Sequence, residues 1–134
     1  KNEMKYIIFD YVKGYKEEDY IRTLTRAKFG IIVDAHESQG FAIEEALSCN
    51  VPLFVWNVKF MSQEYMSKYK DIPCTTIPYW DETCGEYFYD HVNFENNFVR
   101  FLNNIEENKY EPRKFILNNL STEICSEKWK TILL

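Results

Sequence analysis

A short polar segment between two apolar stretches carries the side chains best suited to chemistry in this sequence. Residues 35–41 read Ala-His-Glu-Ser-Gln-Gly-Phe, and Glu44 and Glu45 follow within the next turn. Gly40 lets the backbone approach a ligand closely, and the helix expected after it presents free N–H groups and the positive end of its dipole. This combination is typical of a site for a phosphate or pyrophosphate group.

The stretches that must position this segment alternate between buried strands and amphipathic helices. Periodicity predicts strands over residues 5–12, 29–35, 52–56 and 74–80, and helices over residues 16–28, 40–49 and 61–69. Because the strands are apolar on both faces, we expect a parallel sheet covered by helices, with right-handed crossovers. Ligands of such sheets bind beyond the carboxyl ends of the strands, which is where residues 35–41 would lie.

The remaining chain is expected to be helical. Apolar residues recur at helical spacing from Phe94 to Ile105, after Asn93 as a plausible N-cap. Pro112 suits the first position of another helix, and Ser121 or Thr122 suits the cap of a last one. The predicted fold class is α/β, a Rossmann-like parallel sheet of about four strands flanked by helices, with C-terminal helices. We expect one domain over residues 1–134.

Composition excludes several classes of partner. The chain has 134 residues, 46% of them hydrophobic, with ten Tyr, ten Phe and three Trp, which is ample for a core. Its formal net charge of -5 argues against nucleic acid as a partner, because binding phosphate backbones needs a surplus of Lys and Arg. No apolar run approaches the roughly 18 residues of a membrane helix, so no integral membrane segment is expected.

The cysteines and histidines suggest neither a metal centre nor a disulfide scaffold. Cys49, Cys74, Cys84 and Cys125 are widely spaced without a CxxC pair, and His36 and His91 are isolated from them. We therefore expect free thiols, no metal and no cofactor. With no layout typical of a signal peptide, we expect a chain of the reducing cytoplasm.

The segment ESQGFAIEEALSCNVPLFVW resembles the signature of retaining glycosyltransferases of the GT-B fold, group 1 or family 4-like. In that family a glutamate, a glycine three residues later and a second glutamate followed by alanine open a helix that leads into a strand beginning with proline. Here these positions are Glu37, Gly40, Glu45, Ala46 and Pro52, with seven residues between the two glutamates. Less specific similarity covers most of the chain and indicates the later part of the C-terminal, nucleotide-sugar-binding domain.

The resemblance implies a role for each matched residue. Glu37 would face the donor sugar near the reacting carbon as the catalytic residue, and Glu45 would accept hydrogen bonds from the ribose hydroxyls. A carboxylate suits both tasks because it accepts two hydroxyl hydrogen bonds at once. The backbone amides of Gln39, Gly40 and Phe41 would hold the diphosphate, whose negative charge grows as the glycosidic bond breaks.

Two further residues complete the predicted donor site, and alternatives stand beside each assignment. His36 is either a wall of the pocket or a structural histidine. The family's Arg and Lys for the diphosphate would lie before this segment, and Lys13 and Lys16, in the turn after the first expected strand, are the nearest available cations. Glu44 and Glu45 border the apolar stripe of their helix from opposite sides, so only the resemblance selects Glu45. Glu37 taken alone would be a solvated carboxylate at a helix start.

The family's donor domain normally begins with two further strand–helix units, and an acceptor-binding domain precedes it. The partners expected are therefore a nucleotide-sugar and an acceptor-binding domain or second chain. The first strand is also expected to leave an exposed sheet edge that invites pairing with another copy. Three functions compete: a donor-binding domain that transfers a sugar with retention, a noncatalytic nucleotide-sugar-binding or protein-interaction module, and an unrelated flavodoxin-like domain.

Overall fold

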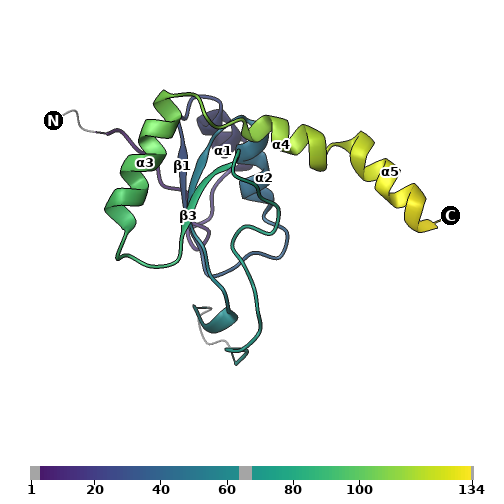
Figure 1. The fold of residues 1–134 in the computed structure, drawn as a ribbon, viewed down its shortest axis with the longest axis horizontal. Helices are drawn as coiled ribbons and strands as arrows, with labels where there is room; N and C mark the ends of the chain where they lie inside the picture. Colours follow the sequence, from purple (N-terminus) through teal and green to yellow (C-terminus); the bar gives the residue numbers. More distant parts are fainter. Residues whose placement is uncertain (1–3, 64–67, 134) are drawn as a thin grey trace.

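A three-stranded parallel sheet forms the centre of the chain (Figure 1). The computed structural model describes residues 4–63 and 68–133. The strands are β1 Gly30–Val33, β2 Leu53–Trp56 and β3 Gly85–Phe88, in the order β1-β2-β3, and Leu53 of β2 lies between Gly30 and Gly85 in register. All three strands therefore end at the same edge of the sheet.

Helices cover both faces of the sheet. They are α1 Glu17–Leu24, α2 Phe41–Ser48, α3 Phe94–Glu106, α4 Pro112–Asn119 and α5 Thr122–Leu133, with a 3-10 turn η1 at Met61–Gln63. The α/β class, the parallel sheet and the C-terminal helices are thus confirmed. α1, α2 and α4 pack on one face and α3 on the other, because successive residues of β2 point to opposite sides.

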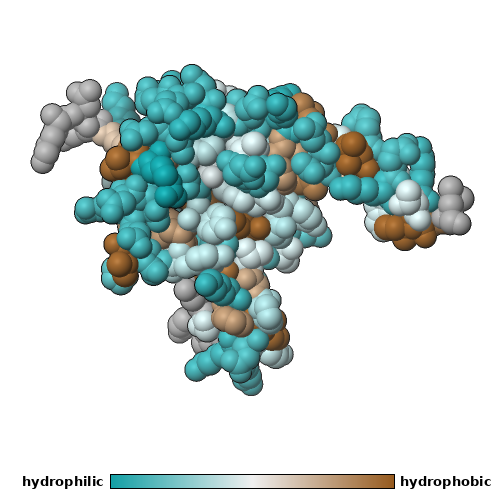
Figure 2. Space-filling model, viewed as in Figure 1, coloured by the Kyte–Doolittle hydropathy of each residue, from teal (hydrophilic) through white to brown (hydrophobic). Residues whose placement is uncertain are grey.

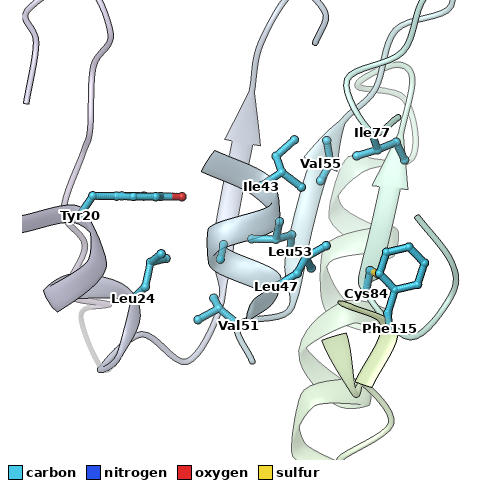
Figure 3. Packing of buried hydrophobic residues seen from close by; sticks show 11 residues of the cluster. Tyr20, Leu24, Ile43, Leu47, Val51, Leu53, Val55, Ile77, Cys84 and Phe115 are labelled. Carbon is cyan, nitrogen blue, oxygen red and sulfur yellow. The ribbon is translucent and has the colours of Figure 1, made fainter. Parts of the chain in front are cut away.

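The face under α1 and α2 is largely aliphatic. Ile43 and Leu47 of α2 meet Leu53 and Val55 of β2, and all four are at most 2% exposed (Figure 3). The same cluster includes Tyr20, whose hydroxyl donates to the backbone oxygen of Ala42 at 2.8 Å. This hydrogen bond joins α1 to the first turn of α2, the helix that directly follows Gly40.

The opposite face is built from phenylalanine rings. Phe54 of β2 and Phe101 of α3 are fully buried, with ring centroids 5.3 Å apart. Phe88 stacks on Phe54 at 4.7 Å, and Phe29 meets Phe101 edge-on at 5.6 Å. Such contacts bury large areas and hold α3 across β2 and β3. β1 lacks comparable cover on this face, since Ile31 and Val33 are 48% and 73% exposed.

The structure corrects two of the predicted strands. Residues 5–12 form no strand and leave Ile7 67% and Ile8 76% exposed, because no neighbouring strand pairs with them in the part of the chain described. Residues 74–80 are also irregular; side chains of Asn57 and Thr75 bind the N–H groups of Thr76 and Ile77 that a sheet ladder would use. The third strand lies at Gly85–Phe88 instead.

The other predicted helices differ less from the observed ones in their boundaries. The predicted helix at 16–28 is observed as Glu17–Leu24, and those at 40–49 and 94–105 are confirmed to within a residue at each end. Of the helix expected at 61–69, residues 61–63 form a 3-10 turn and residues 64–67 lie outside the described residues. The exposed sheet edge belongs to β1, not to residues 5–12.

The last helix stands apart from the sheet. α5 extends away beyond α4 (Figure 1) and has no buried residue among those described. Hydrophobic side chains gather near its C-terminal end (Figure 2), where Ile132 and Leu133 are 72% and 75% exposed. Within the described ranges, no helix is both long enough and apolar enough to cross a bilayer.

Gly85 should be the least replaceable glycine of the sheet. Its φ is +139°, and a Cβ there would collide with the backbone oxygen of Leu53. We expect Gly85→Ala to lower the free energy of unfolding by at least about 3 kcal/mol in urea titrations followed by circular dichroism. Gly14→Ala is the control: φ is +70° but no atom lies within 4 Å, so about 1 kcal/mol is expected. Equal losses in the two variants would contradict this.

Candidate functional site

The predicted site residues follow β1 directly, at the carboxyl edge of the sheet. The chain turns at Asp34, whose Oδ1 accepts a hydrogen bond from the Ala35 N–H at 2.6 Å. Glu37 then donates its backbone N–H to the oxygen of Thr75 at 3.0 Å. Gly40 follows in the left-handed conformation, with φ 77° and ψ 42°, and α2 begins at the next residue. Glycine suits this position because side chains rarely tolerate positive φ.

One buried amide connects the three strand ends. Asn57, which follows β2 and is 4% exposed, accepts three hydrogen bonds on Oδ1, from Val58 N, Thr75 Oγ1 and Thr76 N at 2.8, 2.8 and 2.9 Å. Its Nδ2 lies 3.5 Å from the hydroxyl of Tyr89, which follows β3. Since Thr75 also holds the backbone of Glu37, Asn57 fixes the position of the candidate catalytic glutamate indirectly.

The groups around Glu37 shift its pKa in opposite directions. Burial, followed by the neighbouring Asp34 carboxylate, raises the pKa of Glu37 above its usual range. The Gly40 N–H donates to its carboxylate and nearby His36 also acts on it, both of which lower this pKa. Because the charge of Asp34 opposes ionisation of Glu37, the two side chains lie close enough to influence each other directly.

The second predicted glutamate faces α1. Burial, followed by Glu17 of α1, raises the pKa of Glu45. The side chains of Glu45 and Glu17 are therefore close neighbours where α1 meets α2. Burial alone raises the pKa of Glu44, its neighbour on α2. Glu44 and Glu45 thus point in different directions, as their places on either side of the apolar stripe predict.

A cluster of tyrosines lies between the two glutamates. Tyr15 packs against Tyr11 and Tyr20, with 5.6 Å between ring centroids in each pair. The hydroxyl of Tyr11 experiences the charges of Glu37 and Asp34, whereas that of Tyr20 experiences the charge of Glu45. A hydrogen bond with Tyr15 and burial are the largest causes that raise the pKa of Tyr11, and these charges raise it further. Glu37 thus acts on the Tyr11 end of this cluster, where the ring is 68% exposed, and Glu45 acts on Tyr20, which is buried.

The other residues predicted to form the site differ in their exposure and in their contacts. Gln39 and Phe41 are exposed at the start of α2, Phe41 to 68%, whereas Gly40 is buried. His36 is half-buried beside Glu37. The Lys13 side chain is 83% exposed and its Nζ lies 3.5 Å from the carboxylate of Asp10, so its charge is partly matched within its own loop.

Several residues of the site were absent from the sequence prediction. Asp34, Tyr11 and Glu17 reach it from the ends of different elements, and their pattern in the sequence carries no motif. Asn57 directly after a buried strand is the one signal that could have been used, because polar residues at strand ends often line sites in parallel sheets. Lys59 also lies beyond β2, with Nζ 4.5 Å from the ring centre of Tyr89.

A hollow of about 760 Å³ lies elsewhere, near the amino end of β3. There Glu86 accepts hydrogen bonds from Arg100 at 2.6 and 3.2 Å, from Asn104 at 3.2 Å and from Tyr110 at 3.1 Å. These groups satisfy one another and join β3 to α3. We assign this hollow a structural role, because its charged side chains are already paired.

Metal binding and known relatives add no further assignment. Among the described residues there is no group of three or more His, Cys, Asp or Glu side chains that could hold a metal ion. Comparisons of the chain with protein-family models, curated proteins and solved structures give no match. The chemistry of the strand ends is therefore the basis on which a function is proposed.

Replacing Asn57 should destabilise the strand ends. Asn57→Ala leaves the Val58 and Thr76 N–H groups and the Thr75 hydroxyl without their acceptor. We expect a loss of about 2–4 kcal/mol in the free energy of unfolding, measured by urea denaturation. Asn118→Ala on the exposed side of α4 is the matched control and should change it by less than about 0.5 kcal/mol. A similarly small effect at Asn57 would contradict the assigned role.

The Asp34–Glu37 pair predicts a pH-dependent effect of Glu37→Gln. Because the folded state raises the pKa of Glu37, it holds that proton more firmly than the unfolded chain does. This contribution to stability is complete below the ordinary glutamate pKa and is lost as pH rises through the raised value. We expect Glu37→Gln to raise Tm at pH 7.5 and to leave it nearly unchanged at pH 4, by scanning calorimetry.

The control for this measurement is Glu82→Gln, which alters an exposed loop. Its Tm should follow that of the parent chain at both pH values. A Glu37→Gln variant that is less stable than the parent at pH 7.5, or equally shifted at both pH values, would show that the carboxylates do not repel each other in the folded state.

Proposed function

We propose that the chain is the donor-binding portion of a retaining glycosyltransferase with a Rossmann-like sheet. It would bind a nucleotide diphospho-sugar at the carboxyl edge of β1 and β2 and support transfer of the sugar to an acceptor held by another domain or chain. The observation that carries the proposal is that Glu37 acts on Tyr11 and Glu45 acts on Tyr20, two rings that both pack against Tyr15. These glutamates are the two that the resemblance to glycosyltransferases selects.

The start of α2 supports a diphosphate site. Gly40 itself is buried, but its neighbours Gln39 and Phe41 are exposed at the start of α2, where a ligand can approach. The positive end of the α2 dipole faces this side of the sheet. As the bond between sugar and phosphate breaks, negative charge grows on the leaving diphosphate, and a fixed dipole stabilises that charge without a metal ion.

The glutamates suit the neutral parts of such a ligand. The carboxyl oxygens of Asp34 and Glu37 can accept hydrogen bonds from sugar hydroxyls. Glu45, beside Glu17, offers the same function to the ribose hydroxyls. Tyr11 presents an exposed ring between them, on which a sugar or base can pack. Each part of the ligand thus meets a group of suitable chemistry.

A noncatalytic nucleotide-sugar-binding module is the second candidate, favoured by two observations. The Gly40 N–H already donates to Glu37, and Lys13 is engaged by Asp10, so neither is committed to a diphosphate. A chain of this kind would keep the sugar and ribose contacts and bind without turnover. A flavodoxin-like domain unrelated to glycosyltransferases would lack these contacts altogether.

Isothermal titration calorimetry with UDP, GDP and their sugars tests the donor site. We expect binding with a Kd of about 1 mM or tighter. Glu45→Ala should weaken it at least about tenfold, because hydrogen bonds to a charged group contribute about 1.5–3 kcal/mol. Glu44→Ala is the matched control on the same helix and should bind as the parent does. Absence of binding to every nucleotide would contradict both the glycosyltransferase and the module.

Donor hydrolysis distinguishes the enzyme from the module. Transfer needs a second half to orient the acceptor and exclude water, so we expect little or no hydrolysis by this chain alone. Addition of an acceptor-binding chain that restores transfer, with loss of that transfer in Glu37→Ala, would establish the enzyme. Nucleotide binding that is never accompanied by turnover would favour the module.

A further inference from the structure

β1 is an edge strand whose outer side is open. It pairs with β2 on one side, and no described strand lies on the other. Two side chains of β1, Ile31 and Val33, are 48% and 73% exposed. They lie on the face of the sheet that α3 covers over β2 and β3. Strands of parallel sheets are normally buried on both faces, and an apolar edge of this kind readily pairs with another strand.

The same chain carries a strand-like segment without a sheet. Tyr6, Ile7 and Ile8 are 80%, 67% and 76% exposed, although their residue types favour strands. The segment is anchored at Phe9, whose ring lies 5.2 Å from that of Tyr15 and 5.0 Å from that of Tyr20. Beyond this anchor the N-terminal end lies at one extreme of the molecule (Figure 1), where it can reach a second copy.

We propose that residues 5–8 of a second copy add to the open edge of β1 as an antiparallel strand, and that two chains exchange these segments reciprocally. Charge favours this direction. Antiparallel pairing of residues 5–8 with residues 31–34 brings Lys5 beside Asp34, whereas parallel pairing of the same residues would place Lys5 beside Ile31 and Asp34 beside Ile8.

The same register matches the side chains. Ile8 then lies opposite Ile31, and Tyr6 lies opposite Val33, on the face left uncovered beside α3. Ile7 lies opposite Ile32, which already packs into the aliphatic cluster. Aromatic and β-branched residues are favourable cross-strand partners, and an antiparallel edge strand on a parallel sheet is a common arrangement. Four exposed apolar side chains would be covered in each copy by one exchange.

Sedimentation velocity of single substitutions and of their mixture tests the exchange. Ile8→Lys removes the donated strand and Val33→Lys blocks the accepting edge; both positions are exposed, so the fold should persist, as checked by circular dichroism. We expect the parent chain to dimerise and each variant to weaken dimerisation at least about tenfold. Mixing the variants should give a mixed dimer with one intact exchange of the two, weaker than the parent dimer but tighter than either variant alone, because the Val33→Lys chain still donates and the Ile8→Lys chain still accepts.

Val12→Lys, at a position 96% exposed outside the paired segment, is the matched control and should dimerise as the parent does. A parent chain that is monomeric at several hundred micromolar overturns the proposal. So does a dimer that withstands both substitutions, a mixture of the variants that stays monomeric, or a dimer abolished by Ile132→Lys on α5 but not by Val33→Lys. None of these outcomes depends on nucleotide binding.

Discussion

The three hydrogen bonds accepted by the buried Asn57 oxygen are the interaction on which the carboxyl edge of the sheet depends. The strands end there together, so the segments that leave them lose their ladder partners at the same level. Asn57 replaces those partners for Val58, Thr75 and Thr76, and Thr75 in turn holds the backbone of Glu37. A side-chain amide suits this task because its oxygen accepts several donors without carrying a charge into the interior.

Helices cover the two faces of the sheet in different ways. On one face α1, α2 and α4 cover β1 and β2 with largely aliphatic side chains, and Gly40 before α2 has a left-handed conformation. On the other face the phenylalanine cluster covers β2 and β3 and leaves β1 open. The candidate site and the open edge thus share one strand, with Asp34 at the junction of the two.

Whether an element could be predicted from the sequence depends on whether local or long-range contacts stabilise it. α2, α3 and α4 were predictable because each combines an apolar stripe with a local start signal, such as Pro112 at the first position of α4. Residues 5–12 and 74–80 look like strands locally, but a strand needs a neighbour, and pairing is decided by the rest of the fold. Glu37 and Gly40 could be predicted as a unit. Their partners Glu17 and Tyr11 could not, because long-range packing brings them to the site, whereas Asp34 lies three residues before Glu37 in the same turn.

The charge of the site decides which parts of a ligand it can hold. Glu37 beside Asp34 and Glu45 beside Glu17 already have raised pKa values, so placing a diphosphate against them would cost further repulsion. Hydroxyl groups carry no such penalty and can donate hydrogen bonds to these carboxyl oxygens. An anionic group would instead favour the α2 dipole or Lys59, beyond β2. With a formal net charge of -5 adding long-range repulsion, affinity for a nucleotide-sugar would come mainly from its hydroxyls and rings, and only modestly from its phosphates.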